Sequence, residues 1–176
     1  IAHSLCPTHI GPESARVTIG EGRCAKPYSA SLFNISAMSY GSLSKNAILA
    51  MNAGARQGNF YHNTGEGGLS PYHLEPGGDL VWQIGTGYFG CRAGDRGFDA
   101  DKFAENANRE QVQMIEVKLS QGAKPAHGGI LPGKKVNAEI AAIRGVSVGE
   151  TVVSPPAHSA CSGPKGLLEF VSQLRS

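Results

Sequence analysis

Apolar and polar residues follow regular patterns from residue 32 onward, and these patterns predict strands and helices in alternation. Short runs rich in bulky residues predict four buried strands, at residues 32–38, 59–63, 80–85 and 114–119. Apolar residues spaced three and four apart, behind capping residues, predict the helices. We expect one helix from Ser42 or Ser44 through Gln57, and others at residues 100–106 behind Asp99, 138–144 behind Asn137 and 164–174.

The first thirty residues lack this regularity. They contain Pro7, Pro12 and Pro27 among scattered glycines, so we expect residues 1–30 to form an extended lead-in segment. The structured domain is then expected to cover residues 31–176. No repeat with a fixed period is present in the chain.

The alternation of strands and helices favours parallel βαβ units. Polar and glycine-rich residues follow the strands, as they do in (β/α)₈ barrels, where the loops at the carboxyl ends of the strands form the active site. Eight such units need about 250 residues, and residues 31–176 supply about four. The sequence therefore predicts an α/β protein that forms the N-terminal half of a (β/α)₈ TIM barrel.

Composition and charge argue against several classes of protein. The chain has 16 basic and 14 acidic residues without a basic block, which argues against a nucleic-acid-binding protein. No apolar run approaches the roughly 20 residues of a membrane-spanning helix. Cysteines stand at positions 6, 24, 91 and 161, with no Cys-x-x-Cys pair and no zinc-finger spacing, so no metal site is expected.

The cysteine spacing also bears on the cellular compartment. Disulfides of a secreted protein are one alternative, but the wide spacings favour free thiols. Free thiols point to a reducing compartment, which is either the cytoplasm or an organellar matrix.

Four loops contain residues that could take part in chemistry. Small residues at 36–41 could let a flat ligand approach the backbone, or could simply allow close packing. Glu66 stands among three glycines in the string NTGEGG. The loop could wrap around a ligand and direct the carboxylate toward it, or it could be an ordinary glycine-rich turn with Glu66 in solvent. Lys118 lies near the end of a predicted strand and is either functional or half-exposed, and Lys124 follows in a glycine-rich turn where two cations could meet an anion. His158 is a solitary histidine in a loop, and such a histidine more often has a structural role than a catalytic one.

Longer strings are more distinctive than any single loop. They are ISAMSYGSLS at 35–44, HNTGEGG at 62–68, KLSQGAKPAHGGILPGKKV at 118–136 and SPPAHS at 154–159. Together they closely resemble the FMN-binding domain of the glutamate synthase family, over a length from about residue 28 to the end of the chain. The string GTGYFGCR at 85–92 is most similar to the stand-alone FMN-binding branch of that family.

The resemblance implies a barrel of the FMN-linked oxidoreductase type, with FMN lying across its carboxyl-terminal mouth. It implies reductive amination of 2-oxoglutarate to L-glutamate by reduced FMN, with free or glutamine-derived ammonia as the nitrogen source. The residues that it implies as catalytic are Glu66 and Lys118. It further implies FMN binding by Ala37, Met38, Ser39, Tyr40, Glu66, Lys118 and Gln121, and 2-oxo acid binding by Lys124 and Arg144.

The chain departs from the glutamate synthases proper, which have Glu in the place of His127, Gln in the place of Ile130 and an Arg in the segment where this chain has Tyr88. The family's FMN-phosphate loops and iron–sulfur cysteines are expected only in a full-length protein. Two hypotheses follow. The chain is part of an FMN-dependent glutamate-synthase-like oxidoreductase, inactive alone and completed by the rest of the barrel or by a partner subunit. Alternatively, it is a catalytically inactive truncated relative that serves as a structural subunit of a larger complex.

Overall fold

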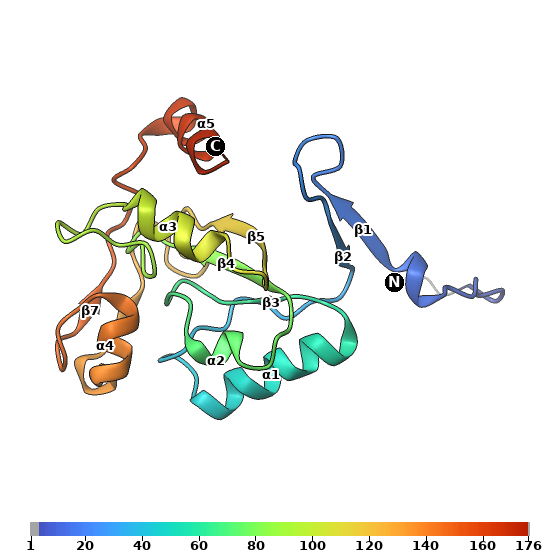
Figure 1. Ribbon diagram of the computed structural model, residues 1–176, viewed down its shortest axis with the longest axis horizontal. Coiled ribbons are helices and arrows are strands. Elements are labelled where there is room, and N and C mark those ends of the chain that lie inside the picture. The colour runs from blue at the N-terminus through green and yellow to red at the C-terminus, as the bar shows by residue number, and fades with distance from the viewer. Residues whose placement is uncertain (1–3, 176) are drawn as a thin grey trace.

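The computed structural model describes residues 4–175, which form a mixed α/β fold (Figure 1). The strands are β1 (Arg16–Ile19), β2 (Tyr28–Ser31), β3 (His62–Asn63), β4 (Leu80–Ile84), β5 (Val112–Val117), β6 (Ile130–Leu131) and β7 (Val152–Val153). The α-helices are α1 (Lys45–Gly58), α2 (Pro71–Leu74), α3 (Ala100–Ala107), α4 (Ala138–Arg144) and α5 (Gly163–Leu174). Two short 3-10 helices are η1 (Pro12–Ser14) and η2 (Gly133–Lys135).

A parallel sheet with the strand order β3-β4-β5 lies at the centre. Strand β4 has the sequence LVWQI and is buried along its whole length. Because side chains alternate between the two faces of a strand, Trp82 packs toward α3, where its ring stacks on Phe103 with centroids 5.7 Å apart. Gln83 lies on the opposite face, in register with Glu116 of β5. The parallel strand–helix units that the sequence predicted are confirmed.

Three helices begin at residues predicted to cap them. The Ser44 hydroxyl accepts a hydrogen bond from the backbone N–H of Ala47, and the side chains of Asp99 and Asn137 cap α3 and α4 in the same way. A capping oxygen satisfies an amide that has no partner within its own helix, which explains why these residues start helices. Helix α4 ends at Gly145, whose left-handed conformation (φ 61°) closes the last turn.

The predicted strand at residues 32–38 is wrong. This segment runs beside β3 without forming a strand: it makes one isolated parallel bridge, between Ile35 and His62, and a further backbone hydrogen bond from Met38 to Asn63. The side chains of Leu32 and Phe33 are 69% and 76% exposed, so the bulky residues that suggested a buried strand lie largely in solvent. Three parallel strands therefore form in place of the four expected.

Two antiparallel pairings were not indicated by the sequence pattern. Strands β1 and β2 form a hairpin inside the predicted lead-in segment, and this hairpin extends away from the central sheet (Figure 1). Strands β6 and β7 pair through only two residues each. Strands this short contain too few apolar positions for their period to stand out in a sequence.

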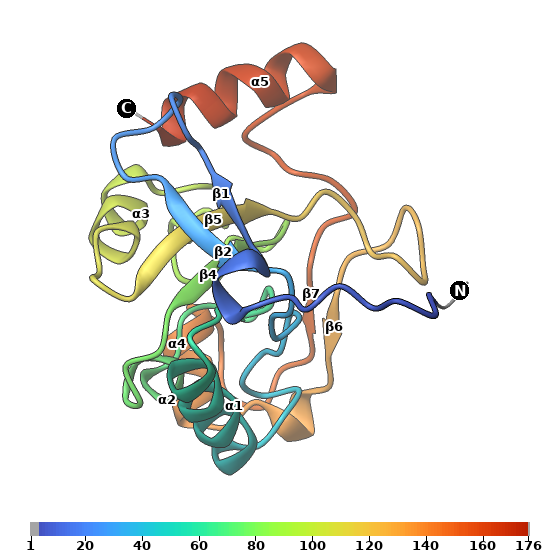
Figure 2. The same ribbon diagram turned by 90° about the vertical axis from the view of Figure 1, so that its right-hand side faces the viewer.

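The core is divided into two clusters. One lies between the central sheet, α3 and α5, and contains Trp82, Ile84, Tyr88, Cys91, Phe103 and Phe170. The other surrounds α4 and the β6–β7 pair, and contains Phe89, Leu131, Val136, Ile140, Ala141 and Val152. Figure 2 shows α5 at one end of the molecule and α1 and α2 at the other.

Several absences hold for residues 4–175. The strands described there do not close into a barrel. The four cysteines form no disulfide with one another. No helix in this part of the chain is long and apolar enough to span a membrane.

Candidate functional site

Three of the residues singled out in the sequence meet in one polar cluster, which we call the Glu66–Lys118–Gln121 cluster. The Lys118 ammonium lies 3.3 Å from Glu66 Oε2. The Gln121 amide nitrogen donates to both oxygens of Glu66, at 3.0 and 2.9 Å, and its oxygen accepts from Lys118 at 3.2 Å. The Lys118 and Glu66 side chains are 26% and 20% exposed. The cluster is therefore charge-balanced, satisfied and still open to a ligand.

The cluster lies where parallel strands end. Lys118 directly follows β5, and its backbone N–H donates to the carbonyl of Ile84 at the end of β4. Glu66 is in the loop after β3, and two glycines leave room for its carboxylate. A Cβ atom at Gly85 or Gly129 would come within 2.9 Å and 2.2 Å of Glu66 side-chain atoms. The carboxyl edge of the sheet and these glycines together place Glu66 opposite Lys118.

The segment at residues 37–40 lies against the same loop. The Met38 N–H donates to the Asn63 carbonyl, and the Met38 carbonyl accepts from the His73 ring. A Cβ at Gly65 would lie 2.9 Å from the backbone nitrogen of Ser39, so the two loops touch through their main chains. The side chain of Ala37 is exposed and lines a cavity of about 400 Å³ beside the face of the sheet that carries Gln83 and Glu116.

Glu116, Asn63 and Gln83 form a second polar group in that cavity. The Glu116 carboxylate accepts hydrogen bonds from the side-chain amides of Asn63, at 3.1 Å, and Gln83. All three residues line the cavity with Ala37. The face of the sheet that leads to the Glu66–Lys118–Gln121 cluster is thus polar rather than a closed apolar core.

The two residues expected to bind a 2-oxo acid differ in their surroundings. Arg144, at the end of α4, is 5% exposed, and its guanidinium donates to the Tyr40 carbonyl at 3.2 Å. It lies over the Phe89 ring, 5.0 Å from the centroid, and a Cβ at Gly67 would lie 2.7 Å from it. Lys124 is exposed, and within residues 4–175 its side chain has no hydrogen bond or ion pair.

Burial changes the electrostatics of Arg144. Loss of water around the guanidinium lowers its pKa, and the nearby negative charge of Glu66 partly opposes that shift. The Nε atom of Arg144 is buried without a hydrogen-bond partner among the described residues. A buried donor without a partner is costly in free energy, so the Arg144 guanidinium is not fully hydrogen-bonded within the described residues.

Two residues that support the site, Tyr88 and His158, were not assigned to it from the sequence. The His158 ring bridges the Tyr88 hydroxyl, at 3.1 Å, and the Lys118 carbonyl, at 2.8 Å, while the Ala160 N–H donates to the Tyr88 hydroxyl at 3.0 Å. Since the Lys118 carbonyl can only accept, the ring nitrogen facing it carries the proton and the other accepts from Tyr88. This series of hydrogen bonds holds the backbone of Lys118 in place. Only the string SPPAHS hinted at it, and nothing in the sequence marks the positive φ of 51° at Tyr88.

No group of three or more His, Cys, Asp or Glu side chains that could hold a metal ion occurs in the part of the chain that the structure describes. The Glu66–Lys118–Gln121 cluster and the adjacent 37–40 segment are accessible groups at the carboxyl edge of the sheet that could contact a cofactor.

Comparison with known proteins points in one direction. Residues 8–176 match the family model described as a conserved region in glutamate synthase. The chain is 42% identical over 171 residues to the glutamate synthase large subunit-like protein YerD of Bacillus subtilis (strain 168), covering 96% of this chain and 32% of that protein.

Two further relatives are more distant. The archaeal-type NADPH glutamate synthase of Thermotoga neapolitana is 37% identical over 161 residues, covering 86% of this chain and 29% of the relative. The NADPH glutamate synthase large chain of Bacillus subtilis (strain 168) is 33% identical over 150 residues, covering 82% of this chain and 9% of the relative. The chain thus spans about a third or less of the length of these relatives.

Proposed function

The chain belongs to the glutamate synthase family, and from this premise we propose that it is part of an FMN-dependent oxidoreductase of the glutamate synthase type. In the proposed enzyme, β3, β4 and β5 are consecutive strands of the N-terminal half of a (β/α)₈ barrel. The parallel order of these strands and the polar inner face beside them support this placement.

The observation on which the proposal depends most is the Glu66–Lys118–Gln121 cluster at the carboxyl edge of the sheet. Parallel α/β proteins bind their ligands at this edge. An ammonium, a carboxylate and an amide, each partly accessible, fit the polar edge of a flavin ring, which exchanges hydrogen bonds and gains negative charge on reduction. The donor set therefore fits FMN.

When bound, FMN supplies the hydride that reduces an imine to an amine. Lys118 would place a positive charge beside the ring, where it stabilises the reduced form. Glu66 holds the Lys118 ammonium in place, and Gln121 hydrogen-bonds both. Ala37, Met38, Ser39 and Tyr40 would lie along the ring through their main chains.

Lys124 and Arg144 are proposed to bind the carboxylates of a 2-oxo acid that condenses with ammonia. The buried Arg144 guanidinium with its unpartnered Nε supports an anion beside the loop of Glu66 and Gly67. Lys124 is free to turn toward such an anion, because its side chain is exposed. His127, exposed in the same loop, takes the place of a family Glu, so the acid need not be 2-oxoglutarate.

The decisive experiment is redox titration of the complete protein with its flavin bound. Lys118→Met should lower the reduction potential, because the reduced ring loses its counter-charge. Lys124→Met is the matched control and should leave the potential unchanged. An unchanged potential in a Lys118→Met protein that still binds FMN would contradict the assignment. A complete protein that binds no FMN would instead support a structural subunit of a larger complex.

A further inference from the structure

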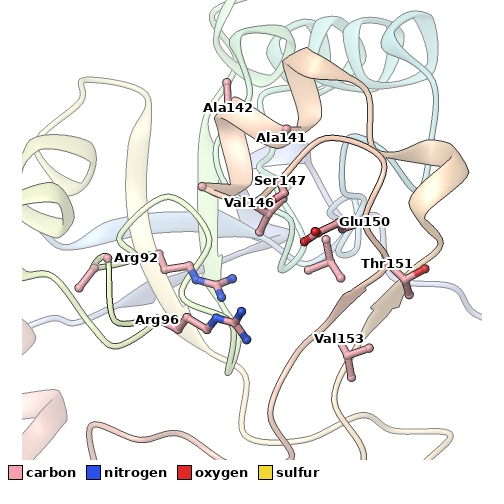
Figure 3. Close-up of a pocket in the computed structure, with 13 residues that line it drawn as sticks. Arg92, Arg96, Ala141, Ala142, Val146, Ser147, Glu150, Thr151 and Val153 are labelled. Atoms are coloured by element: carbon pink, nitrogen blue, oxygen red, sulfur yellow. The ribbon is translucent and has the colours of Figure 1, made fainter.

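A second pocket lies outside the proposed flavin site, between the loop that follows Phe89 and helix α4. Its volume is about 520 Å³, within the range of small-molecule sites. Figure 3 shows the side chains of Arg92 and Arg96 extending beside each other into this pocket, with Glu150 pointing toward it from the other wall. We call it the Arg92–Arg96–Glu150 pocket.

A tight turn builds the cationic wall. The backbones of Arg92 and Phe98 form an isolated antiparallel β-bridge, and the Ala93 N–H donates to the Gly97 carbonyl at 3.0 Å. Arg96 N–H donates to the Ala93 carbonyl, also at 3.0 Å, so the two arginines are held four positions apart on one small loop. The Arg92 guanidinium lies 5.5 Å from the centroid of the Phe89 ring, a contact that fixes its direction.

The two arginines repel each other. Burial and the charge of Arg96 both lower the pKa of Arg92. Within residues 4–175 neither guanidinium forms an ion pair with a carboxylate. A pair of like charges without a counter-ion is unfavourable, and a bound carboxylate would relieve it with forked hydrogen bonds.

The other wall has the opposite charge. Glu150 precedes β7 and lines the pocket with the hydroxyl residue Ser147, but among residues 4–175 it forms no ion pair with either arginine. The small residues Ala141 and Ala142 of α4 also line the pocket. Positive and negative groups thus face one cavity without neutralising each other.

We propose that the Arg92–Arg96–Glu150 pocket binds a free α-amino acid as its zwitterion. The carboxylate of the ligand would lie against the two guanidiniums and its ammonium against the Glu150 carboxylate. A simple anion would meet Glu150 unfavourably, and a simple cation would meet two arginines. Only a ligand with both charges a few ångströms apart satisfies both walls.

The pocket is separate from the Glu66–Lys118–Gln121 cluster but shares one side chain with its surroundings. Phe89, which contacts Arg92, also contacts Arg144 at 5.0 Å. The proposal does not depend on flavin chemistry, so it can be tested by binding alone.

The test uses matched ligand pairs that differ only in the ammonium group. Backbone amide signals of Ala93, Ser147 and Thr151 in the isotope-labelled protein are followed by NMR during titration with L-alanine, propionate, L-glutamate and glutarate. At least one amino acid should bind ten-fold or more tightly than its partner lacking the ammonium. Glu150→Gln should remove that preference, and Arg92→Gln should weaken binding of both members ten-fold or more.

Two control variants locate the binding. Arg109→Gln removes an arginine outside the pocket and should change nothing, and Lys118→Met should likewise leave binding intact. Equal binding of an amino acid and its ammonium-free partner, or stronger binding of inorganic phosphate, would show a plain anion site and overturn the proposal. The absence of any shift with either amino acid, in protein whose thermal unfolding is normal, would overturn it as well.

Discussion

The carboxyl edge of the parallel sheet and residues 122–127, further along the loop between β5 and β6, contain similar side chains in very different states. At the sheet edge, Lys118 is paired with Glu66, and the pair is hydrogen-bonded by Gln121. In the loop, Lys124 and His127 are exposed, and Lys124 has no side-chain partner within residues 4–175. The two lysines come from one continuous string of the sequence, residues 118–136.

The difference shows what positions a functional side chain. Lys118 follows a strand that is hydrogen-bonded to β4, and its carbonyl is held by His158, so its side chain has few directions to take. Residues 122–127 follow the same strand, β5, a few positions later, but all of them are exposed. A side chain in the first region is preorganised, whereas one in the second must be ordered by what binds to it.

The largest effect that would sharpen this comparison comes from two glycines of the loop. A Cβ at Gly128 would lie 1.8 Å from the Ser154 carbonyl oxygen, whereas a Cβ at Gly122 would meet nothing within 4 Å. Gly128→Ala should therefore cost about 3 kcal/mol of unfolding free energy or more, because the backbones of two segments must separate. Scanning calorimetry should show a melting temperature lower by roughly 6–12 °C.

Gly122→Ala is the matched control. It should leave the melting temperature unchanged or slightly raised, since alanine reduces the freedom of the unfolded chain. Equal destabilisation by both substitutions would mean that the whole loop is packed, and the contrast between the two regions would fail.

A second effect is a loss of stability at low pH, which we expect from the buried histidines His62 and His73. His62 of β3 is fully buried beside His73, and burial, together with the His73 charge, lowers its pKa to about 4. Burial also lowers the pKa of His73. A depressed folded-state pKa gives stability that is complete above the unfolded value of about 6.5 and is lost as the pH falls toward 4.

For His62 alone the linkage amounts to roughly 2 kcal/mol lost between pH 6.5 and pH 5. Urea unfolding across this interval should show the loss, and His62→Leu should reduce it. A flat profile in the unaltered protein would contradict the lowered pKa of His62, because the folded and unfolded chains would then bind the same number of protons across this interval.

The sequence predicted the framework of the sheet region better than its surroundings. Ser44, Asp99 and Asn137 were predictable caps because a capping bond is local in the chain. The strand expected at residues 32–38 did not form because strand formation depends on neighbours across the sheet, and this segment has one isolated bridge to β3, at Ile35, and one further backbone hydrogen bond, from Met38. Each strand of the β1–β2 hairpin has only four residues, which is too short for an apolar period to be detected.

The site followed the same rule. Glu66, Lys118 and Gln121 were identified through resemblance to a family, and the structure brings them together. Their mutual contact over 52 and 55 positions of sequence could not be derived from local pattern. Tyr88 was noted only as a departure from the family, yet its hydroxyl is bonded to the histidine that holds Lys118, an arrangement that needs the folded chain.

The smallest predicted effect compares the two lysines directly, as Lys118→Met and Lys124→Met. Methionine keeps most of the length of lysine and removes the charge, so the change in free energy of unfolding mainly reports the ion pair. Lys118→Met should cost about 1 kcal/mol, because Glu66 keeps its Gln121 hydrogen bonds and both charges retain some contact with water. Lys124→Met should stay within about 0.5 kcal/mol of zero. Combining each with Glu66→Gln completes the argument, since coupled residues deviate from additivity and separate ones do not. The Lys118 cycle should give a coupling of about 1 kcal/mol and the Lys124 cycle none, whereas coupling in the second would mean that Lys124 already turns toward Glu66 without a substrate.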